Sequence, residues 1–356
     1  MWFPSQVRDI SAEWLENALI ASGLEVEPGS LSSIAGDRIG TGLVGLNIRY
    51  ELRWAQPGRG LPQTLVVKLP STDPTSRATG IGLRNYEREV RFYREIAGVT
   101  AARLAKCFAA EWDPDSGEFI LVLEDLAPGE VGDQMRGCTV QQAELAVDVA
   151  SAIHGSWWTH PKLAAFGEWM SGPYDEGRAD QLLMLWEMAA PQFLQRHPGV
   201  LTSAQSGLLD KLGSSLKPWL LQRQGPWTLT HGDFRVDNMI FGPDWMVPVD
   251  WQTPGIGIGA ADVAYFLGAS LLPDDRRTHE ERLVRRWHEG VVTRGVKDYP
   301  WDQCWRQYRS LSFAGVVMGV AASMITQQTE RGDEMFLTMV TRHLDQAADL
   351  QSVDFL

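Results

Sequence analysis

The chain has 356 residues, of which 44% are hydrophobic and 22% are charged, a composition typical of a globular protein long enough for two domains or two lobes. A net charge of -13 argues against a nucleic acid or an anionic membrane as the partner, because either would require a basic face. The charge still leaves room for a local basic pocket that binds phosphate.

The sequence predicts neither secretion nor membrane insertion. Its three cysteines are far apart and show no disulfide or zinc spacing, which is typical of a reducing cytosol. The N-terminus lacks a cationic region followed by an apolar run, so we expect no signal peptide. The longest apolar stretch, 311–325, is shorter than a membrane span of about 20 residues and predicts a buried helix. We therefore expect a cytoplasmic protein.

The first third of the chain is predicted to be rich in strands. A short amphipathic helix over 9–23 comes first, with Ser11 as its expected N-cap. Alternating or β-branched apolar runs then predict three strands, at 46–52, 64–70 and 118–126. Between the second and third strands we expect a mobile loop at 71–82 and a helix over 83–97 with a strongly charged face.

Helical periodicity takes over after a Pro/Gly-rich hinge at 127–133. Helices are expected over 139–158, from about 180 to 223 and from about 275 to 350, where 274–286 is expected to be a solvated helix with ion pairs four residues apart. Residues 227–252 interrupt them with two short apolar runs, which predict a small hairpin. The fold class is therefore α+β, with a β-rich N-terminal lobe over 1–125 and a mostly helical C-terminal lobe over 126–356.

Three glycines, Gly40, Gly42 and Gly45, form the pattern G-x-G-x-x-G. A dinucleotide-binding turn would need a strand before this pattern and a helix after it, but here a predicted strand follows. That context favours a strand–turn–strand flap whose backbone approaches nucleotide phosphates. A simple glycine-rich hairpin explains the pattern equally well.

Lys68 lies inside a predicted apolar strand, where burial of its charge is expensive without an anionic partner. Glu89 is the expected partner, because Tyr86, Glu89 and Phe92 share one face of the predicted helix and that face should contact the sheet. Glu87 is expected to point to solvent. The alternative is that Lys68 extends its amine from an edge strand into solvent.

The segment "HGDFRVDN", residues 231–238, and the later "VPVDWQ" place acidic and amide groups where a core is being built. Asp233, with Asn238 five residues on and Asp250 beyond a hairpin, suits phosphoryl transfer. The first carboxylate would position and deprotonate a hydroxyl. The other two side chains offer oxygen ligands to Mg²⁺. Arg235 could supply positive charge at the γ-phosphate.

These residues resemble the aminoglycoside phosphotransferase and choline kinase-like superfamily. "LTHGDFRVDNMIF" and "VPVDWQTPGIGIGAADVAYFL" match its signature H-G-D-x-x-x-x-N, then D-[FW]-[QEG], then a downstream D-[LV]-A. "VASAIHGSWW" and "YEREVRFYREI" resemble the ecdysteroid-kinase-like branch. The resemblance covers about 36 to 270 and implies a protein-kinase-like bilobal fold and a small-molecule kinase that uses ATP and Mg²⁺.

Carried over residue by residue, the resemblance implies that Asp233 is the catalytic base and that Asn238 and Asp250 are metal ligands. It makes Lys68, paired with Glu89, the phosphate contact. The interlobe hinge that faces the adenine would run from Glu124 to Leu126. The same comparison implies that two further residues organise the catalytic loop, His231 and Asp262, the latter by accepting backbone N–H groups or by capping a helix.

The match departs from protein kinases at Gly232, where they have arginine, and at the Asp250 to Gln252 triplet, where they have D-F-G. No A-P-E-like element follows, which argues against a protein substrate. Asp237 is expected to bond within its loop rather than to act as a second base. His154 is expected to be a packed helix histidine, and the other histidines, among them His343, show no metal spacing.

Two other functions remain open from the sequence. One is a metal-dependent hydrolase using His231, Asp233 and Asp250, although a catalytic metal usually has three or more protein ligands and its own water. The other is a non-catalytic nucleotide-binding pseudokinase. For a kinase, the acidic chain permits a cationic aminoglycoside as the hydroxyl acceptor, whereas the 15 tryptophans and the family motifs favour an apolar hydroxylated compound such as a macrolide. Packing of the helices explains the tryptophans equally well.

Overall fold

The computed structural model describes residues 2–40, 44–56, 58, 60–325 and 328–356. The chain forms two compact units. The first contains Met1–Val99, Leu104–Pro128 and Asp250–Gln252, and the second contains Thr100–Arg103, Gly129–Val249 and Thr253–Leu356. The division into domains between residues 125 and 126 stays a prediction. The compact units place the short segment that holds Asp250 with the strand-rich part.

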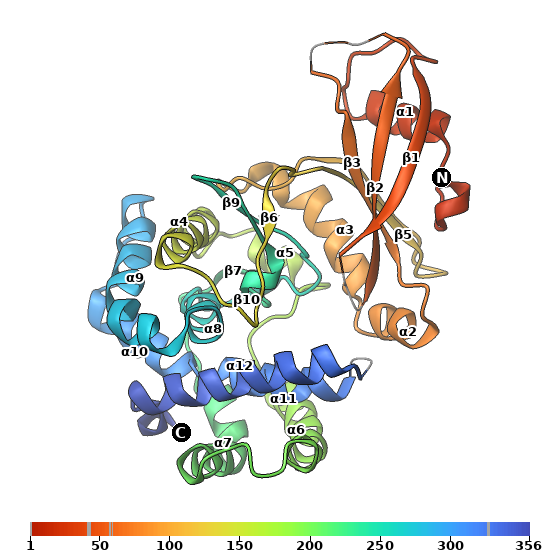
Figure 1. Cartoon of the computed structure of the whole chain (residues 1–356). Helices are drawn as coiled ribbons and strands as arrows, with labels where there is room; N and C mark the ends of the chain where they lie inside the picture. The colour runs from red at the N-terminus through yellow and green to blue at the C-terminus, as the bar shows by residue number, and fades with distance from the viewer. Residues whose placement is uncertain (1, 41–43, 57, 59, 326–327) are drawn as a thin grey trace. The chain divides into compact units, whose positions relative to one another are not determined.

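A five-stranded antiparallel sheet in the order β1-β2-β3-β5-β4 forms the first unit (Figure 1). Its strands are β1 (Leu31–Ile39), β2 (Gly45–Trp54), β3 (Thr64–Pro70), β4 (Cys107–Trp112) and β5 (Phe119–Glu124). Lys68 lies opposite Asn47 of β2 and Leu121 of β5. Lys68 is therefore on the central strand, which removes the edge-strand alternative.

Alternation along β3 sends successive side chains to opposite faces of the sheet. Leu65 and Val67 join the hydrophobic cluster that contains Leu15 and Leu19 of α1 (Ala12–Ala21). The next residue, Lys68, points to the other face and contacts α3 (Asn85–Glu95). The sheet thus buries its core on one face and presents the lysine to a helix on the other.

The segment predicted as a mobile loop is a helix, α2 (Pro74–Gly82), so that prediction was wrong. Asp73 caps it by accepting the backbone N–H of Ser76 at 2.8 Å, and Pro74 occupies the first turn, where its missing N–H costs nothing. Gly80 allows close packing on Tyr86 of α3, since a Cβ at this position would collide with the phenol ring. Capping and tertiary contact therefore outweigh the poor helix propensity of the segment.

The second unit is mostly helical (Figure 1). Its helices are α4 (Val140–Ser156), α5 (Leu163–Phe166), α6 (Glu176–Arg196), α7 (Ser203–Leu221), α8 (Ala260–Ser270), α9 (Pro273–Thr293), α10 (Trp301–Leu311), α11 (Ala314–Ile325) and α12 (Glu330–Asp349). Its short strands form two small sheets, from β6 (Glu130–Val131), β8 (Met239–Phe241) and β9 (Met246–Pro248), and from β7 (Thr228–Thr230) and β10 (Gly255–Gly257). The predicted hairpin is the β8–β9 pair.

Two hydrophobic cores hold this unit together. One packs α4, α8, α9 and α10 around residues such as Trp287, and the other packs α6, α7, α11 and α12 around residues such as Trp219. Five of the tryptophans in the helical part are buried, Trp157, Trp169, Trp186, Trp219 and Trp287, which favours their packing role over an aromatic-lined cleft. In the described ranges, none of the helices has the length and apolarity to cross a membrane.

Helix α9 is less solvated than its charged sequence suggests. Arg276 and Glu280 are buried and paired at 2.8 Å, and Glu280 also accepts a hydrogen bond from the Tyr308 hydroxyl at 2.7 Å. The ion pairs expected four residues apart do occur on the exposed face, as between Arg285 and Glu281. The solvated-helix prediction was therefore wrong for the inner face, because the charges there satisfy one another inside the core.

Candidate active site

The first unit contains a cluster of four polar side chains, Lys68, Glu89, Asp250 and Gln252, which we call the lysine cluster; all but Asp250 are buried. The Lys68 Nζ lies 2.8 Å from the Glu89 carboxylate and 2.8 Å from Asp250 Oδ1. Gln252 donates to Glu89 Oε2 at 3.3 Å. The pairing of Lys68 with Glu89 is thus present as expected, and Asp250 joins it.

Charge balance keeps Lys68 protonated although it is buried. Burial alone would lower the pKa of Lys68, but the carboxylates of Asp250 and Glu89 outweigh it and hold the pKa above its ordinary value. The Asp250 side chain is 40% exposed, whereas that of Glu89 is 1% exposed. Glu89 is therefore the permanent counter-ion, and Asp250 is the partner that can turn to a ligand.

The backbone conformation of Asp250 and the packing of the next residue, Trp251, hold Asp250 in the lysine cluster. Asp250 adopts a left-handed conformation with φ of 66°, a strained state for a non-glycine residue that is typical of functional sites. Next to it, Trp251 is fully buried and stacks on Phe92 of α3 with ring centroids 3.8 Å apart. The stacked pair anchors the strained residue within the first unit.

The three glycines of the G-x-G-x-x-G pattern differ in their surroundings. Glycine at position 45 leaves room for the Lys68 side chain, because a Cβ there would lie 3.0 Å from Lys68 Cε. Gly40 has a φ of 70°, which glycine adopts readily. Gly42 lies outside the described residues. Of the expected hinge, Glu124 ends β5 and Leu126 is buried.

Asp233 lies in the second unit, in the loop between β7 and β8. Its carboxylate accepts hydrogen bonds from the Tyr265 hydroxyl at 2.9 Å and from Asn238 Nδ2 at 2.8 Å. Arg235 Nε donates to both of its oxygens, at 3.2 Å each. Burial would raise the pKa of Asp233, but the Arg235 charge and the hydrogen bonds from Tyr265 and Asn238 outweigh it, so the pKa is lowered.

The backbone before Asp233 is organised by Asp262 of α8. Its carboxylate accepts the backbone N–H of His231 at 2.7 Å and that of Gly232 at 3.1 Å, as the family resemblance implied. Asp262 is the third residue of α8 and not its N-cap, which is Gly259. The helix-capping alternative is therefore wrong.

The tautomers of two histidines follow from their partners. His231 Nε2 faces the carbonyl of Val249 at 3.0 Å and must donate, so Nδ1 is free to accept the Asp233 N–H at 3.3 Å. His154 Nδ1 accepts from the Trp287 indole at 2.9 Å, so Nε2 donates to Asp262 at 3.2 Å. His154 is thus a packed helix histidine, as expected, and it orients the loop organiser.

Arg235 makes a second ion pair, with Asp237 at 2.6 Å. Asp237 thus bonds within its loop as predicted, and its other oxygen also accepts the backbone N–H of Gln134, about 100 residues earlier in the chain, at 2.6 Å. Arg235 Nη1 also approaches the Met335 sulfur at 3.4 Å. The guanidinium that the sequence assigned to the γ-phosphate is therefore held by two carboxylates here.

Two residues of this site were missed in the sequence. Tyr265 lies one helical turn after Asp262, and that spacing of three could have placed it on the same face of α8. Met335 comes from α12, about 100 residues after Asp233, and carries no motif. Tyr265, Ala269, Met335 and Met339 form an apolar cluster beside the Asp233 carboxylate.

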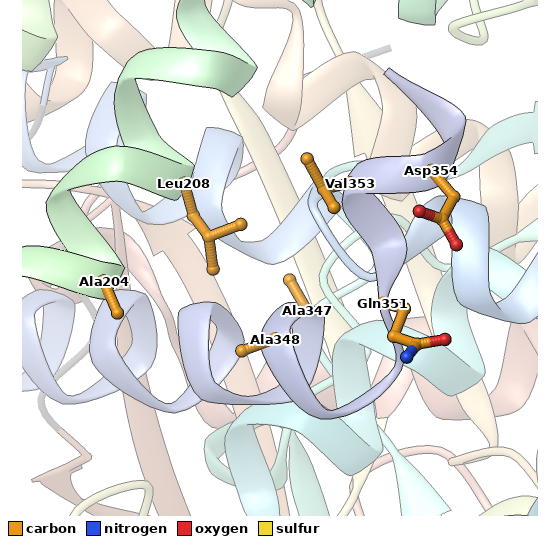
Figure 2. A pocket seen from close by; sticks show the side chains of 7 residues that line it. All are labelled: Ala204, Leu208, Ala347, Ala348, Gln351, Val353 and Asp354. Atoms are coloured by element: carbon orange, nitrogen blue, oxygen red, sulfur yellow. The ribbon is translucent and has the colours of Figure 1, made fainter.

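A separate surface hollow of about 560 Å³ lies between α7 and the C-terminal end of the helical unit (Figure 2). Figure 2 shows small and apolar side chains around it, with Asp354 and Gln351 to one side. Its lining residues are Ala204, Leu208, Ala347, Ala348, Gln351, Val353 and Asp354. It includes none of the predicted site residues, so the hollow is not the candidate active site.

Comparison with curated proteins finds 32% identity over 131 residues with acyl-CoA dehydrogenase family member 10 of Mus musculus. The match covers 31% of this chain but only 12% of that protein, so the chain spans a small part of its relative.

The fold is similar to those of solved kinases. Choline kinase from Cryptosporidium parvum Iowa II matches with a TM-score of 0.59 and 13% identity over 93% of each chain. Plasmodium vivax ethanolamine kinase gives 0.53 and 12%, over 89% of this chain and 83% of that one. The GDP complex of wild-type aminoglycoside 2'-phosphotransferase-IIIa gives 0.52 and 12%, over 94% of this chain and 99% of that one. These likenesses confirm the predicted α+β, protein-kinase-like fold class.

The family model described as the ecdysteroid kinase-like family matches residues 36–295. That range includes the lysine cluster, the loop that holds Asp233 and its organiser Asp262. The chain therefore belongs to the ecdysteroid kinase-like family.

Proposed function

We propose that this protein transfers the γ-phosphoryl group of ATP, in the presence of Mg²⁺, to a hydroxyl group of a small molecule. The observation that carries the proposal is the environment of Asp233. Its pKa is lowered although partial burial acts to raise it, so the carboxylate is ionised and oriented at neutral pH. A fixed carboxylate of this kind suits a base that takes a proton from an alcohol.

The residues fit a hard cation. Asn238 directs Nδ2 to Asp233, so its amide oxygen is free, and no donor to that oxygen is found among the described residues. Asp250 is partly exposed and uses Oδ1 for Lys68, which leaves its second oxygen for a ligand. Carboxylate and amide oxygens are what Mg²⁺ prefers, and the ion would neutralise charge on the phosphates.

In this scheme Asp233 accepts the proton of the acceptor hydroxyl while that oxygen forms a bond to the γ-phosphorus and the bond to the β-phosphate oxygen breaks. The products are a phosphate monoester and ADP, and the proton of the hydroxyl is bound to the Asp233 carboxylate. Lys68, held by Glu89, would contact the phosphates. Arg235 would move from Asp233 towards the transferred group. The nucleotide's other proposed contacts are Gly40, Gly42 and Gly45, together with Glu124 and Leu126.

The environment of His231 argues against the metal-dependent hydrolase. Both ring nitrogens of this histidine have partners, Val249 O and Asp233 N–H, so neither is available to a metal. Across the described parts of the chain, no group of three or more His, Cys, Asp or Glu side chains is placed to hold a metal ion. A pseudokinase is disfavoured because each expected catalytic residue is present, and it is tested by the same experiment as the kinase.

The surroundings of Asp233 favour an uncharged acceptor with an apolar skeleton. Arg235 pairs with both carboxylates of the loop, Asp233 and Asp237, which halves their combined negative charge and weakens the attraction for a polycation such as an aminoglycoside. The apolar cluster that includes Met335 and Met339 lies beside them, and methionines adapt to irregular apolar ligands. A hydroxylated compound of macrolide or similar character therefore suits the site best.

The test is a product screen. The protein is incubated with Mg·ATP, and in parallel with Mg·GTP, against a library of hydroxylated metabolites, and mass spectrometry detects the gain of one phosphoryl group. We expect a product from one class of alcohol, and a loss of turnover of at least about a hundredfold in Asp233→Asn, since a general base contributes that much or more. Nucleotide binding without any product would leave the pseudokinase reading; wild-type turnover in Asp233→Asn would exclude this residue as the base.

A further inference from the structure

The Asp233 carboxylate has no vacant place for an acceptor hydroxyl. An ionised carboxylate offers about four lone-pair positions. Tyr265 takes one on Oδ1, Asn238 takes one on Oδ2, and Arg235 Nε takes one on each oxygen. A base that must receive a proton from substrate therefore has to release one of these three donors first.

Asn238 is poorly placed to leave. Its Nδ2 also donates to the Asp233 backbone carbonyl at 3.0 Å, and the backbone carbonyl of Asn238 accepts the Val249 N–H at 2.9 Å. Arg235, in contrast, is well placed to leave Asp233. Its two contacts with Asp233 are long, they share one N–H, and its Nη1 keeps a shorter contact with Asp237. The guanidinium can therefore withdraw from Asp233 while Asp237 still holds it.

The position of the Tyr265 ring is fixed by a contact with His343. The ring stacks on the His343 imidazole with ring centroids 5.5 Å apart and an angle of 22° between the planes. His343 is fully buried in a slot between Gly268 of α8 and Gly315 of α11, where a Cβ on either glycine would collide with it. Glycine at both positions thus lets three helices close around one imidazole.

A hydrogen-bonded network then fixes His343. Gln346 donates through Nε2 to Glu280 at 3.0 Å, to the Tyr308 oxygen at 2.9 Å and to the Ala264 carbonyl at 3.2 Å. Its amide oxygen is therefore the atom that faces His343 Nδ1 at 3.1 Å, and Nδ1 carries the proton. The orientation of the Tyr265 hydroxyl is traceable to a buried polar network in the core.

We propose that Tyr265 is the positioning residue of the base: it holds Asp233 Oδ1 through the reaction, while Arg235 yields its place to the acceptor hydroxyl. This inference rests on the proposed function. Tyr265 remains a donor at neutral pH, because burial and the neighbouring Asp233 charge raise the pKa of its phenol well above 10. It thus favours the charged carboxylate and keeps one oxygen lone pair aimed, whether or not Arg235 is present.

The first test does not depend on turnover. Protein labelled with ¹³C at aspartate carboxyl groups is titrated by NMR, and the Asp233 signal is assigned by its loss in Asp233→Asn. Tyr265→Phe keeps the stacked ring and removes only the donor, so we expect the pKa of Asp233 to rise. Tyr299→Phe removes the hydroxyl of another buried tyrosine, which bonds to Gln307 outside this network, and should leave the Asp233 titration unchanged. An unchanged Asp233 titration in Tyr265→Phe overturns the proposal.

The second test uses the acceptor alcohol found in the product screen. We expect Tyr265→Phe to lower kcat by about tenfold to a hundredfold, the value of one hydrogen bond to a charged group. KM for ATP should stay the same, and the acidic limb of the kcat–pH profile should move to higher pH. Equal kcat and an equal profile in wild type and variant contradict the positioning role. Should Tyr265→Phe fail to fold, His343→Gln removes the stacked ring together with its bond to Gln346, and it must raise the pKa of Asp233 as well.

The two proposals fail separately. A wild-type protein that transfers no phosphoryl group contradicts the proposed function, and the NMR titration still decides whether Tyr265 controls Asp233. A kinase whose Asp233 titrates alike with and without the Tyr265 hydroxyl keeps its function and loses this inference.

Discussion

His343 shows how a single residue links the core to acid stability. It is fully buried, its Nδ1 bonds to Gln346, and its Nε2 has no hydrogen-bond partner among the described residues. Burial lowers its pKa from 6.5 to about 4; the charges of Arg276 and Arg342 act in the same direction, and the Gln346 bond opposes them. The imidazole is therefore neutral in the folded protein across a pH range in which the unfolded chain binds a proton.

Folding stability should therefore fall on acidification between pH 6.5 and 4. Because the unfolded state binds more protons in that window, the free energy of unfolding rises with pH. From the two pKa values, His343 alone should cost about 2 kcal/mol between pH 7.5 and pH 5. Urea unfolding of wild type and His343→Gln at both pH values checks this, since the variant shares every other titrating group. Equal losses in the two proteins would show that His343 does not titrate in this way.

At the scale of elements, the loop from β7 to β8 depends on one glycine. Gly232 adopts φ of 81°, and a Cβ on it would collide with the Thr253 carbonyl. Next to it, His231 O accepts a hydrogen bond from the Thr253 hydroxyl at 3.1 Å, so the two segments are in direct contact. Glycine is required here for conformation and for space at the same time.

Gly232→Ala should consequently destabilise the protein more than conformation alone explains. Gly295, with φ of 93° and nothing within 4 Å of its missing Cβ, is the matched control. We expect Gly295→Ala to cost about 1–2 kcal/mol from backbone strain. Gly232→Ala should cost at least twice as much, and the difference is read from urea midpoints. Similar midpoints for the two variants would mean that the loop simply shifts to accommodate the methyl group.

The elements also show where sequence reasoning succeeds and where it fails. The strand at 64–70 and the β8–β9 hairpin follow from short apolar runs bounded by turn residues, which are local signals. Helix α2 was missed because its Gly, Ser and Thr content argues against a helix, whereas the Asp73 cap and packing on Tyr86 decide the outcome. Glu87 was expected in solvent, yet it is buried and paired with Arg84 and Arg91. Partners on the same helix made that burial possible.

At the scale of the whole molecule, motif order was enough to predict the fold class and the residues proposed for the chemistry. The pairing of Lys68 with Glu89 could be inferred because both lie on regular elements with a known period. Tyr265 and Met335 could not, since their approach to Asp233 depends on how α8 and α12 pack. A helix that carries no motif contributes to a site only through tertiary structure, which no local pattern reports.

The two units contribute different parts of the proposed chemistry. Lys68, Glu89 and Asp250 belong to the first, and Asp233 with Asn238 belongs to the second. The nucleotide contacts are proposed mostly in the first unit, whereas the base acts on the acceptor. Loss of nucleotide binding and loss of turnover should therefore be separable by mutation.

Mg·ATP should raise the thermal midpoint of the wild type, because a ligand present at 100 times its Kd adds about 2.7 kcal/mol to the free energy of unfolding. Asp233→Asn should retain this stabilisation, since the substitution leaves the lysine cluster intact. Asp250→Ala and Lys68→Met should lose it, the first through the metal and the second through the phosphates. ATP without Mg²⁺ serves as the control and should stabilise all four proteins little. Full stabilisation of Asp250→Ala by Mg·ATP would exclude Asp250 as a metal ligand, even in a protein that phosphorylates its acceptor.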